Sequence, residues 1–166
     1  MPRLLVVHHS PTRSLQRLTE AVVAGARDPE VQATAGVEVV VRPALEASVD
    51  EVLAADGYLL GTSANFGYMS GALKHFFDST FLQVGGALDP SGAAGSSSGA
   101  TAKRPYGLYV HGRYDTTGAI RSVQAIVQAL GWQQAYDVVD VLGDVDDTHT
   151  EAAYALGATL AAVIGG

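Results

Sequence analysis

The sequence predicts an α/β fold, a single three-layer sandwich in which helices cover both faces of a five-stranded parallel sheet. Short apolar runs alternate with longer segments of helical period along all 166 residues. Three of these runs are almost continuously apolar, which is typical of strands that are buried on both faces. Hydrophobic residues reach 48% and charged residues only 16%, a balance that suits a core covered on both sides. Right-handed crossovers between parallel strands then predict the strand order 2-1-3-4-5.

Five segments are predicted as strands because they are short, apolar and rich in β-branched residues. In chain order they are 4–8 (LLVVH), 37–41 (VEVVV), 57–60 (GYLL), 106–111 (YGLYVH) and 135–142 (AYDVVDVL).

Helices are predicted between and after the strands, because apolar residues recur there at helical spacing. The four stripes are Leu15, Leu18 and Val22; Met69, Leu73, Phe76 and Phe77; Ile120, Val123, Val127 and Leu130; and Leu156, Leu160, Val163 and Ile164. A short helix over 49–55 fills the second gap. Capping-box spacing of Ser48 with Glu51, and of Thr148 with Glu151, marks two helix starts.

The chain is interpreted as one domain, 1–166, with an insertion over 85–103. This segment (GGALDPSGAAGSSSGATAK) is dominated by Gly, Ser and Ala, which bury too little apolar surface to offset the entropy of ordering. It falls between the helix of Phe76 and the fourth strand. Both a mobile lid over a ligand crevice and a tolerated loop are consistent with it.

Composition excludes several kinds of protein. The chain has no cysteine, which rules out disulfides, thiolate nucleophiles and iron–sulfur clusters. A net charge of −7 argues against binding to nucleic acid. No apolar run approaches the roughly 20 residues that span a bilayer, so no membrane insertion and a cytoplasmic location are expected. A metal site is not expected either, because adjacent His8 and His9 point to opposite faces of a strand end.

The first connection, 8–15 (HHSPTRSL), runs from the first strand into a helix. Helix starts at the carboxyl ends of such strands present free N–H groups to anions. Ser10, Thr12 and Ser14 could donate to phosphate oxygens, and Arg13 could supply charge. N-capping by Thr12 or Ser14, with Arg13 in solvent, explains the same residues equally well. The loop therefore leaves a phosphomonoester site and an ordinary cap open.

The second connection, 61–71 (GTSANFGYMSG), offers small residues that let the backbone approach a ligand closely. Phe66 and Tyr68 present flat apolar surfaces, and Asn65 presents a polar edge. If exposed, the aromatic pair suits stacking on a planar ring. The alternative is that both aromatic side chains fill the core.

The third connection, 111–118 (HGRYDTTG), combines the cation of Arg113, the ring of Tyr114 and a tight turn at Gly112. In the predicted topology, all three connections meet over one crevice.

The run 61–78 (GTSANFGYMSGALKHFFD) resembles the flavin-contacting loop and following helix of the flavodoxin-like FMN proteins. These include NADPH-dependent FMN reductases and WrbA-type quinone reductases. The order of elements is similar over essentially the whole chain, so the resemblance implies the flavodoxin-like form of the sandwich. In the first connection, Arg13 stands where flavodoxins carry glycine, and a loop with arginine is closer to the reductases.

The resemblance implies FMN as cofactor and assigns three groups of residues to it. The FMN phosphate would be held by Ser10, Thr12, Arg13, Ser14 and Leu15. The isoalloxazine ring would be flanked by Ser63, Ala64, Asn65, Phe66, Gly67 and Tyr68. Its pyrimidine side would be contacted by His111, Gly112, Arg113 and Tyr114. No catalytic side chain is expected, because hydride chemistry takes place on the cofactor.

The implied function is an FMN-dependent oxidoreductase that passes electrons from NADPH or NADH to a quinone, a flavin or a similar small acceptor. The alternative is a flavodoxin-type FMN electron carrier without substrate turnover of its own, with which the acidic charge agrees weakly. A regulatory or scaffolding relative that has lost FMN is a third interpretation. Since relatives commonly assemble, a homodimer or homotetramer is also an expectation.

Overall fold

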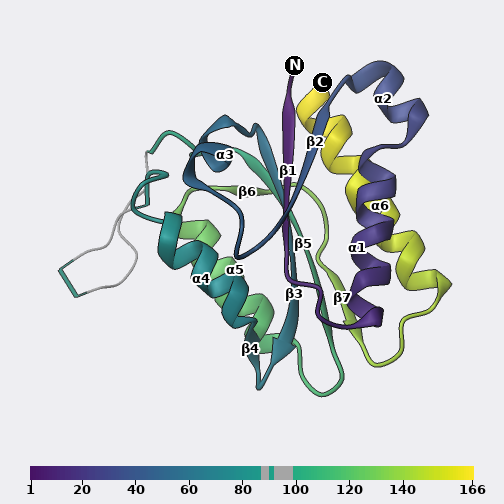
Figure 1. The fold of residues 1–166 in the computed structure, drawn as a ribbon, viewed down its shortest axis with the longest axis vertical. Coiled ribbons are helices and arrows are strands. Elements are labelled where there is room, and N and C mark those ends of the chain that lie inside the picture. Colours follow the sequence, from purple (N-terminus) through teal and green to yellow (C-terminus); the bar gives the residue numbers. More distant parts are fainter. Residues whose placement is uncertain (87–89, 92–98) are drawn as a thin grey trace.

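A computed structural model describes residues 1–86, 90–91 and 99–166 of the chain. Its main sheet is parallel and has helices on both faces (Figure 1). The strands are β1 (Arg3–His8), β2 (Glu38–Pro43), β3 (Gly57–Asn65), β5 (Pro105–Gly112), β6 (Gln133–Gln134) and β7 (Val139–Leu142), with a short β4 (Tyr68–Met69) antiparallel to the end of β3.

The order of the main sheet is β2-β1-β3-β5, and β5 then pairs with β6 near its start and with β7 near its end. β6 and β7 stand in place of the fifth predicted strand, 135–142. Within that range only 139–142 are strand residues, and β6 precedes it. The predicted order 2-1-3-4-5 is therefore confirmed, with the last strand interrupted.

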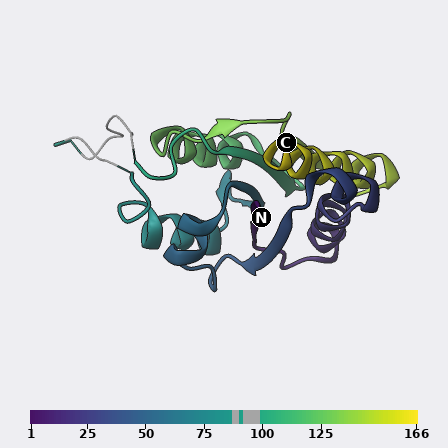
Figure 2. The same ribbon diagram turned by 90° about the horizontal axis from the view of Figure 1, so that it is seen from above.

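Two groups of helices cover the sheet. The helices are α1 (Arg13–Ala26), α2 (Pro29–Ala35), α3 (Val49–Ala54), α4 (Gly71–Thr80), α5 (Thr117–Ala129) and α6 (Asp147–Gly165). Figure 1 and Figure 2 show α1 and α6 on one face, with α3, α4 and α5 on the other. Each group buries its own apolar core against one face of the sheet, as expected from the high apolar content of the sequence.

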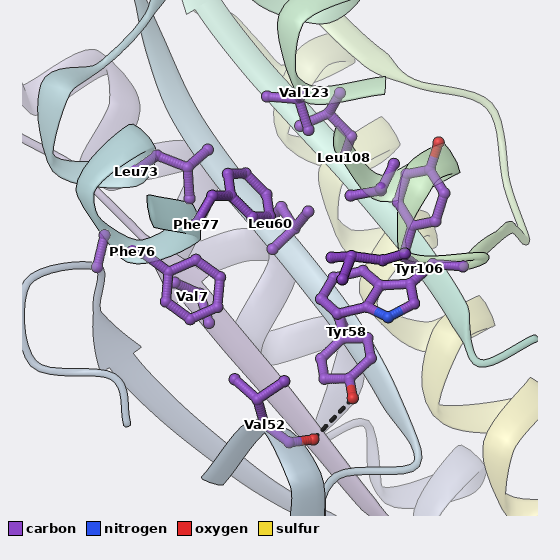
Figure 3. Close-up of a cluster of buried hydrophobic side chains, with 14 of the residues drawn as sticks. Val7, Val52, Tyr58, Leu60, Leu73, Phe76, Phe77, Tyr106, Leu108 and Val123 are labelled. Carbon is purple, nitrogen blue, oxygen red and sulfur yellow. Dashed lines mark hydrogen bonds between the residues drawn. The ribbon is translucent and has the colours of Figure 1, made fainter. Parts of the chain in front are cut away.

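The core under α3, α4 and α5 is built around an aromatic stack (Figure 3). The rings of Tyr58 and Trp132 lie 3.8 Å apart and nearly parallel. The Tyr58 hydroxyl donates to the carbonyl of Val52 at 2.7 Å, so this buried phenol is satisfied.

The same core holds both ends of the 85–103 insertion. Trp132 Nε1 donates to Thr101 Oγ1, which in turn donates to the carbonyl oxygen of Val84. A Cβ atom on Gly85 would lie 2.5 Å from the Cα atom of Gly99, so the two ends run in close contact. They meet beside the start of β5, at the edge of the sheet opposite the carboxyl ends of the strands. The lid interpretation concerns residues 87–89 and 92–98, which lie outside the described residues.

The structure also differs from the prediction at the end of β3 and in one additional helix. β3 continues to Asn65 rather than ending at 60, because Thr62 and Ser63 are buried and pair with β5. The segment 29–35 forms α2, which the periodicity of the sequence did not reveal. Its signals are local ones, with Asp28 capping the start and Gly36 in the left-handed region at the end.

Helix starts were predicted with mixed success. The capping box of Ser48 and Glu51 is present at α3. The predicted capping box of Thr148 and Glu151 is wrong, because α6 begins earlier. Asp146 and His149 form the capping box instead, each side chain accepting from the backbone N–H of the other residue. Among the described residues, no helix has the length and apolarity needed to cross a membrane.

Candidate functional site

The carboxyl ends of β1, β3 and β5 lie at one edge of the sheet, at the bottom of Figure 1. His8 is the register partner of Gly61, and Ser63 is the register partner of His111. All three connections of interest leave from this edge. We call residues 8–14, 61–70 and 111–118 the rim.

At the start of α1, Thr12 is an N-cap, since its Oγ1 accepts from the backbone N–H of Leu15 at 3.2 Å. The capping interpretation is therefore confirmed for Thr12. Arg13 is exposed and pairs with Glu20 at 3.0 Å. The Leu15 side chain is fully buried, so it is not presented to a ligand. The cap leaves the other N–H groups of the first turn, on Arg13 and Ser14, without an intrahelical acceptor.

A chain of side-chain hydrogen bonds runs from the rim into the core. Ser10 Oγ lies 2.8 Å from His8 Nδ1 and 2.7 Å from Thr19 Oγ1, which lies 2.8 Å from the Tyr109 hydroxyl. Burial raises the pKa of Tyr109, so its hydroxyl keeps its proton. The pKa of His8 is lowered, first by burial and then by the charge of His9.

The sequence analysis did not anticipate that Ser10 would form hydrogen bonds with His8 and Thr19. Thr19 falls four residues after Leu15 and therefore lies on the buried face of α1, where a polar residue needs a partner. The position of Thr19 on the buried face was therefore the one signal in the sequence that Thr19 forms a hydrogen bond there.

The second connection is a tight hairpin. β3 and β4 are joined by Phe66 and Gly67, whose φ angles of 51° and 74° are those of a type I′ turn. The relative exposure is 109% for Phe66 and 43% for Tyr68. The interpretation that both rings fill the core is therefore wrong. Phe66 is also strained, because an aromatic residue rarely adopts a positive φ.

Contacts behind the hairpin fix its position. A Cβ atom on Gly118, in the first turn of α5, would lie 1.9 Å from the carbonyl oxygen of Gly67. On the other side, Thr62 Oγ1 accepts from the backbone N–H of Ser70 at 2.9 Å. The exposed ring of Phe66 thus stands on a supported turn.

Ser63 has a buried Oγ atom that finds no hydrogen-bond partner within the described part of the chain. Such an orphaned hydroxyl costs about 1–3 kcal/mol when it stays unsatisfied. Its neighbours Ala64 and Asn65 become progressively more exposed toward the hairpin. A ligand group at the rim would give this hydroxyl a partner.

The third connection begins from a buried residue. His111 Nε2 donates to the carbonyl of Gly143 at 2.7 Å, which turns that ring atom toward the protein rather than outward. A Cβ atom on Gly112 would lie 3.0 Å from both the Ala64 Cβ and the Thr116 Cγ2. The second and third connections therefore pack directly against each other.

Beyond Gly112 the side chains turn to solvent. Arg113 pairs with Asp144 at 2.8 Å, and this hydrogen-bonded guanidinium lowers the pKa of the Asp144 carboxyl. Tyr114 is 94% exposed. The sequence gives no signal for this pair, because Asp144 lies 31 residues after Arg113.

Together these features fit a ligand with an anionic group at one end and a flat ring with polar edges at the other. The first turn of α1 and Arg13 suit the anion, and the exposed aromatic rings suit the flat part. The orphaned Ser63 hydroxyl suits a polar ring edge. Within the described residues, no cluster of three or more His, Asp or Glu is placed to hold a metal ion.

Comparisons with known proteins agree on the fold. No family model matches the chain. A curated protein named flavodoxin, from Aquifex aeolicus, is 36% identical over 98 residues, which are 59% of this chain and 50% of that protein. The chain thus spans about half the length of this curated relative.

Several solved structures match over nearly the whole length of both chains. An archaeal flavodoxin superposes with a TM-score of 0.75 at 15% identity, covering 99% of both chains. A flavodoxin described as WrbA-like, from Agrobacterium tumefaciens, gives a TM-score of 0.71 at 18% identity and covers 99% of this chain and 98% of its own. The fold is flavodoxin-like.

Proposed function

We propose that this chain binds FMN at the rim and carries electrons between other redox proteins, as flavodoxin-type carriers do. The name of the Aquifex relative and those of several structural neighbours support the carrier over the NAD(P)H-dependent reductase that the sequence analysis put first. The observation that carries the proposal is the pairing of a helix start with a fully exposed aromatic ring on a fixed turn, at one edge of the sheet.

The phosphate would sit at the start of α1. The N–H groups of Arg13 and Ser14, the partial positive charge of the helix start and the Arg13 guanidinium all favour an anion there. Because the ion pair of Arg13 with Glu20 is exposed, Arg13 can turn to a phosphate at little cost.

The ring would lie between the second and third connections. Phe66, Tyr68 and Tyr114 offer exposed aromatic faces for stacking. The Ser63 hydroxyl would donate to a polar edge of the ring, and Arg113 would place a positive charge near its pyrimidine side. Bound FMN would supply reversible electron transfer, while these residues bind it and set its electrostatic surroundings.

The electron partners would be other proteins. A net charge of −7 suits docking to cationic surfaces, where complementary charge speeds encounter more than it strengthens the complex. No residue of the rim is required to bind a nicotinamide in this proposal.

Titration of the purified protein with FMN tests the proposal. Binding should quench flavin fluorescence and raise the melting temperature, and ATP, which has phosphates but no flavin, should leave the melting temperature unchanged. Reduction of the loaded protein by a partner reductase, but not by NADPH or NADH alone, identifies a carrier. Rapid bleaching by either nicotinamide would instead favour the reductase, and absence of any FMN binding would overturn both.

A further inference from the structure

We propose that His8 is a positioning residue that couples its own protonation to the binding of a phosphate group at the start of α1, acting through the Ser10 hydroxyl. This inference rests on the proposed FMN site and adds a pH-dependent element to it. It is carried by the hydrogen-bond chain that joins His8, Ser10, Thr19 and Tyr109.

Which group donates in each of these hydrogen bonds follows from the buried end of the network, at Tyr109. The Tyr109 hydroxyl is fully buried, and the described part of the chain offers it no partner other than Thr19. If Tyr109 were the acceptor, its own O–H would be left unsatisfied, at a cost that buried polar groups rarely carry. Tyr109 therefore donates to Thr19, and Thr19 donates to Ser10.

The remaining hydroxyl proton belongs to Ser10, and its acceptor is His8. Ser10 donates to His8 Nδ1, which requires a neutral imidazole that carries its proton on Nε2. In this state the Ser10 hydroxyl faces His8 and is not available to a phosphate oxygen.

Protonation of His8 reverses this bond. An imidazolium carries a proton on Nδ1, so His8 becomes the donor and Ser10 Oγ accepts from both His8 and Thr19. The Ser10 proton is then free to be donated to a phosphate oxygen, and a positive charge stands behind it. The two effects act in the same direction and favour an anion.

The arginines on the elements beside His8 are in ion pairs in the flavin-free protein. Arg13 pairs with Glu20, Arg17 with Asp147 and Arg42 with Glu51, and His8→Asn leaves all three arginines in place. β3 carries no charged residue. Across the start of α6, Asp146 is bonded to His149. His9 is a titratable neighbour whose charge opposes protonation of His8.

The test measures FMN affinity by fluorescence quenching from about pH 5 to about pH 8, in the unmodified protein and in His8→Asn. Asn keeps a polar atom near the Nδ1 position but cannot become a cation. The phosphate of FMN itself titrates near pH 6, and this contribution is common to both proteins. His75→Asn, at an exposed position of α4, is the matched control, and riboflavin is the matched ligand without phosphate.

As pH falls, the ratio of FMN affinities, unmodified protein over His8→Asn, should rise by up to about tenfold per pH unit, the limit for one linked proton. His75→Asn should follow the unmodified protein, and riboflavin should show no such ratio. By reciprocity, NMR titration of the unmodified protein should place the His8 pKa higher with FMN bound than without.

Equal pH dependence in both proteins, or an unchanged His8 titration on FMN binding, would overturn the role of His8 and leave the FMN site intact. A pH-dependent ratio with riboflavin would also overturn it, because the effect would then not need a phosphate. Absence of FMN quenching at every pH would overturn the proposed function instead. The NMR measurement uses the unmodified chain, so it decides the matter even if His8→Asn fails to fold.

Discussion

Gly118 and Gly67 are in direct backbone contact: a Cβ atom on Gly118 would lie 1.9 Å from the Gly67 carbonyl oxygen. The first turn of α5 thereby supports the tip of the hairpin that presents Phe66. Position 118 is glycine because any side chain would push the hairpin away from the sheet. The shape of the rim thus depends on a residue that would not itself touch a ligand.

Gly118→Ala should displace the hairpin and weaken both the fold and the site. Overpacking of this kind costs about 1–3 kcal/mol in the free energy of unfolding, measured by urea denaturation. FMN affinity, measured by fluorescence quenching, should fall as well, because the Phe66 ring is no longer held in place.

Gly71→Ala is the matched control, because a Cβ atom there meets nothing within 4 Å and Gly71 is the first residue of α4. It should leave FMN affinity unchanged and stabilise the protein by about 0.4–1 kcal/mol. If Gly118→Ala behaves like Gly71→Ala, the support of the hairpin by α5 is not required.

Phe66→Asn should separate stability from binding. Asn tolerates the positive φ of this turn position far better than Phe, so the free energy of unfolding should rise by about 1 kcal/mol. Loss of the exposed ring should at the same time lower FMN affinity by about tenfold, as expected for one lost stacking contact. Urea denaturation and FMN titration measure the two effects.

Phe66→Tyr keeps the ring and the strain, so it should change neither quantity much. If Phe66→Asn is more stable and binds FMN as tightly as the unmodified protein, the ring takes no part in binding.

The topology could be predicted from the sequence because buried parallel strands read as apolar runs. The end of β3 could not, since Thr62 and Ser63 are small and polar and only their pairing with β5 makes them strand residues. Local motifs gave Thr12 as one of two candidate caps, beside Ser14, but they could not indicate that Ser10 would meet Thr19. The spacing of Thr19 from Leu15 indicates that Thr19 needs a partner, but which partner it meets depends on how closely α1 approaches the sheet.

The stability of the flavin-free protein should depend on pH through His8. In the folded state the pKa of His8 lies below the ordinary value of a histidine, because burial and the charge of His9 disfavour the cation. Between the two pKa values the unfolded chain binds more protons, so the free energy of unfolding should fall as the pH drops from about 7 toward about 5. Urea denaturation across this range measures the slope.

His8→Asn should flatten this part of the profile. Loss of stability at lower pH should remain in the variant, because Asp28, Glu51 and Asp144 have lowered pKa values and lose their favourable contacts only when they are protonated. An identical slope between about pH 7 and about pH 5 in both proteins would contradict the assignment to His8.

The Arg113–Asp144 pair should tune the reduction potential of bound FMN. Reduction adds negative charge to the flavin, so Arg113→Ala should lower the two-electron potential and Asp144→Asn should raise it. Both shifts should be small, on the order of 10–20 mV, because the two side chains are exposed and screened. Equilibrium titration against a redox dye measures them, and two shifts of the same sign would contradict the electrostatic argument.

Ser63 and Ser70 are both buried at the rim but should respond to alanine with opposite signs. Ser70 Oγ accepts from the N–H of Leu73 and caps α4, so Ser70→Ala should cost about 1 kcal/mol of stability. Ser63 Oγ has no partner among the described residues, so Ser63→Ala removes an unsatisfied group and should stabilise the flavin-free protein by about 1 kcal/mol. In the FMN complex that gain should disappear and FMN affinity should fall by about fivefold to tenfold, since the ligand loses a hydrogen bond worth about 1 kcal/mol. Urea denaturation with and without FMN measures both quantities, and a stabilisation that persists undiminished in the complex would mean that the Ser63 hydroxyl does not face the ligand.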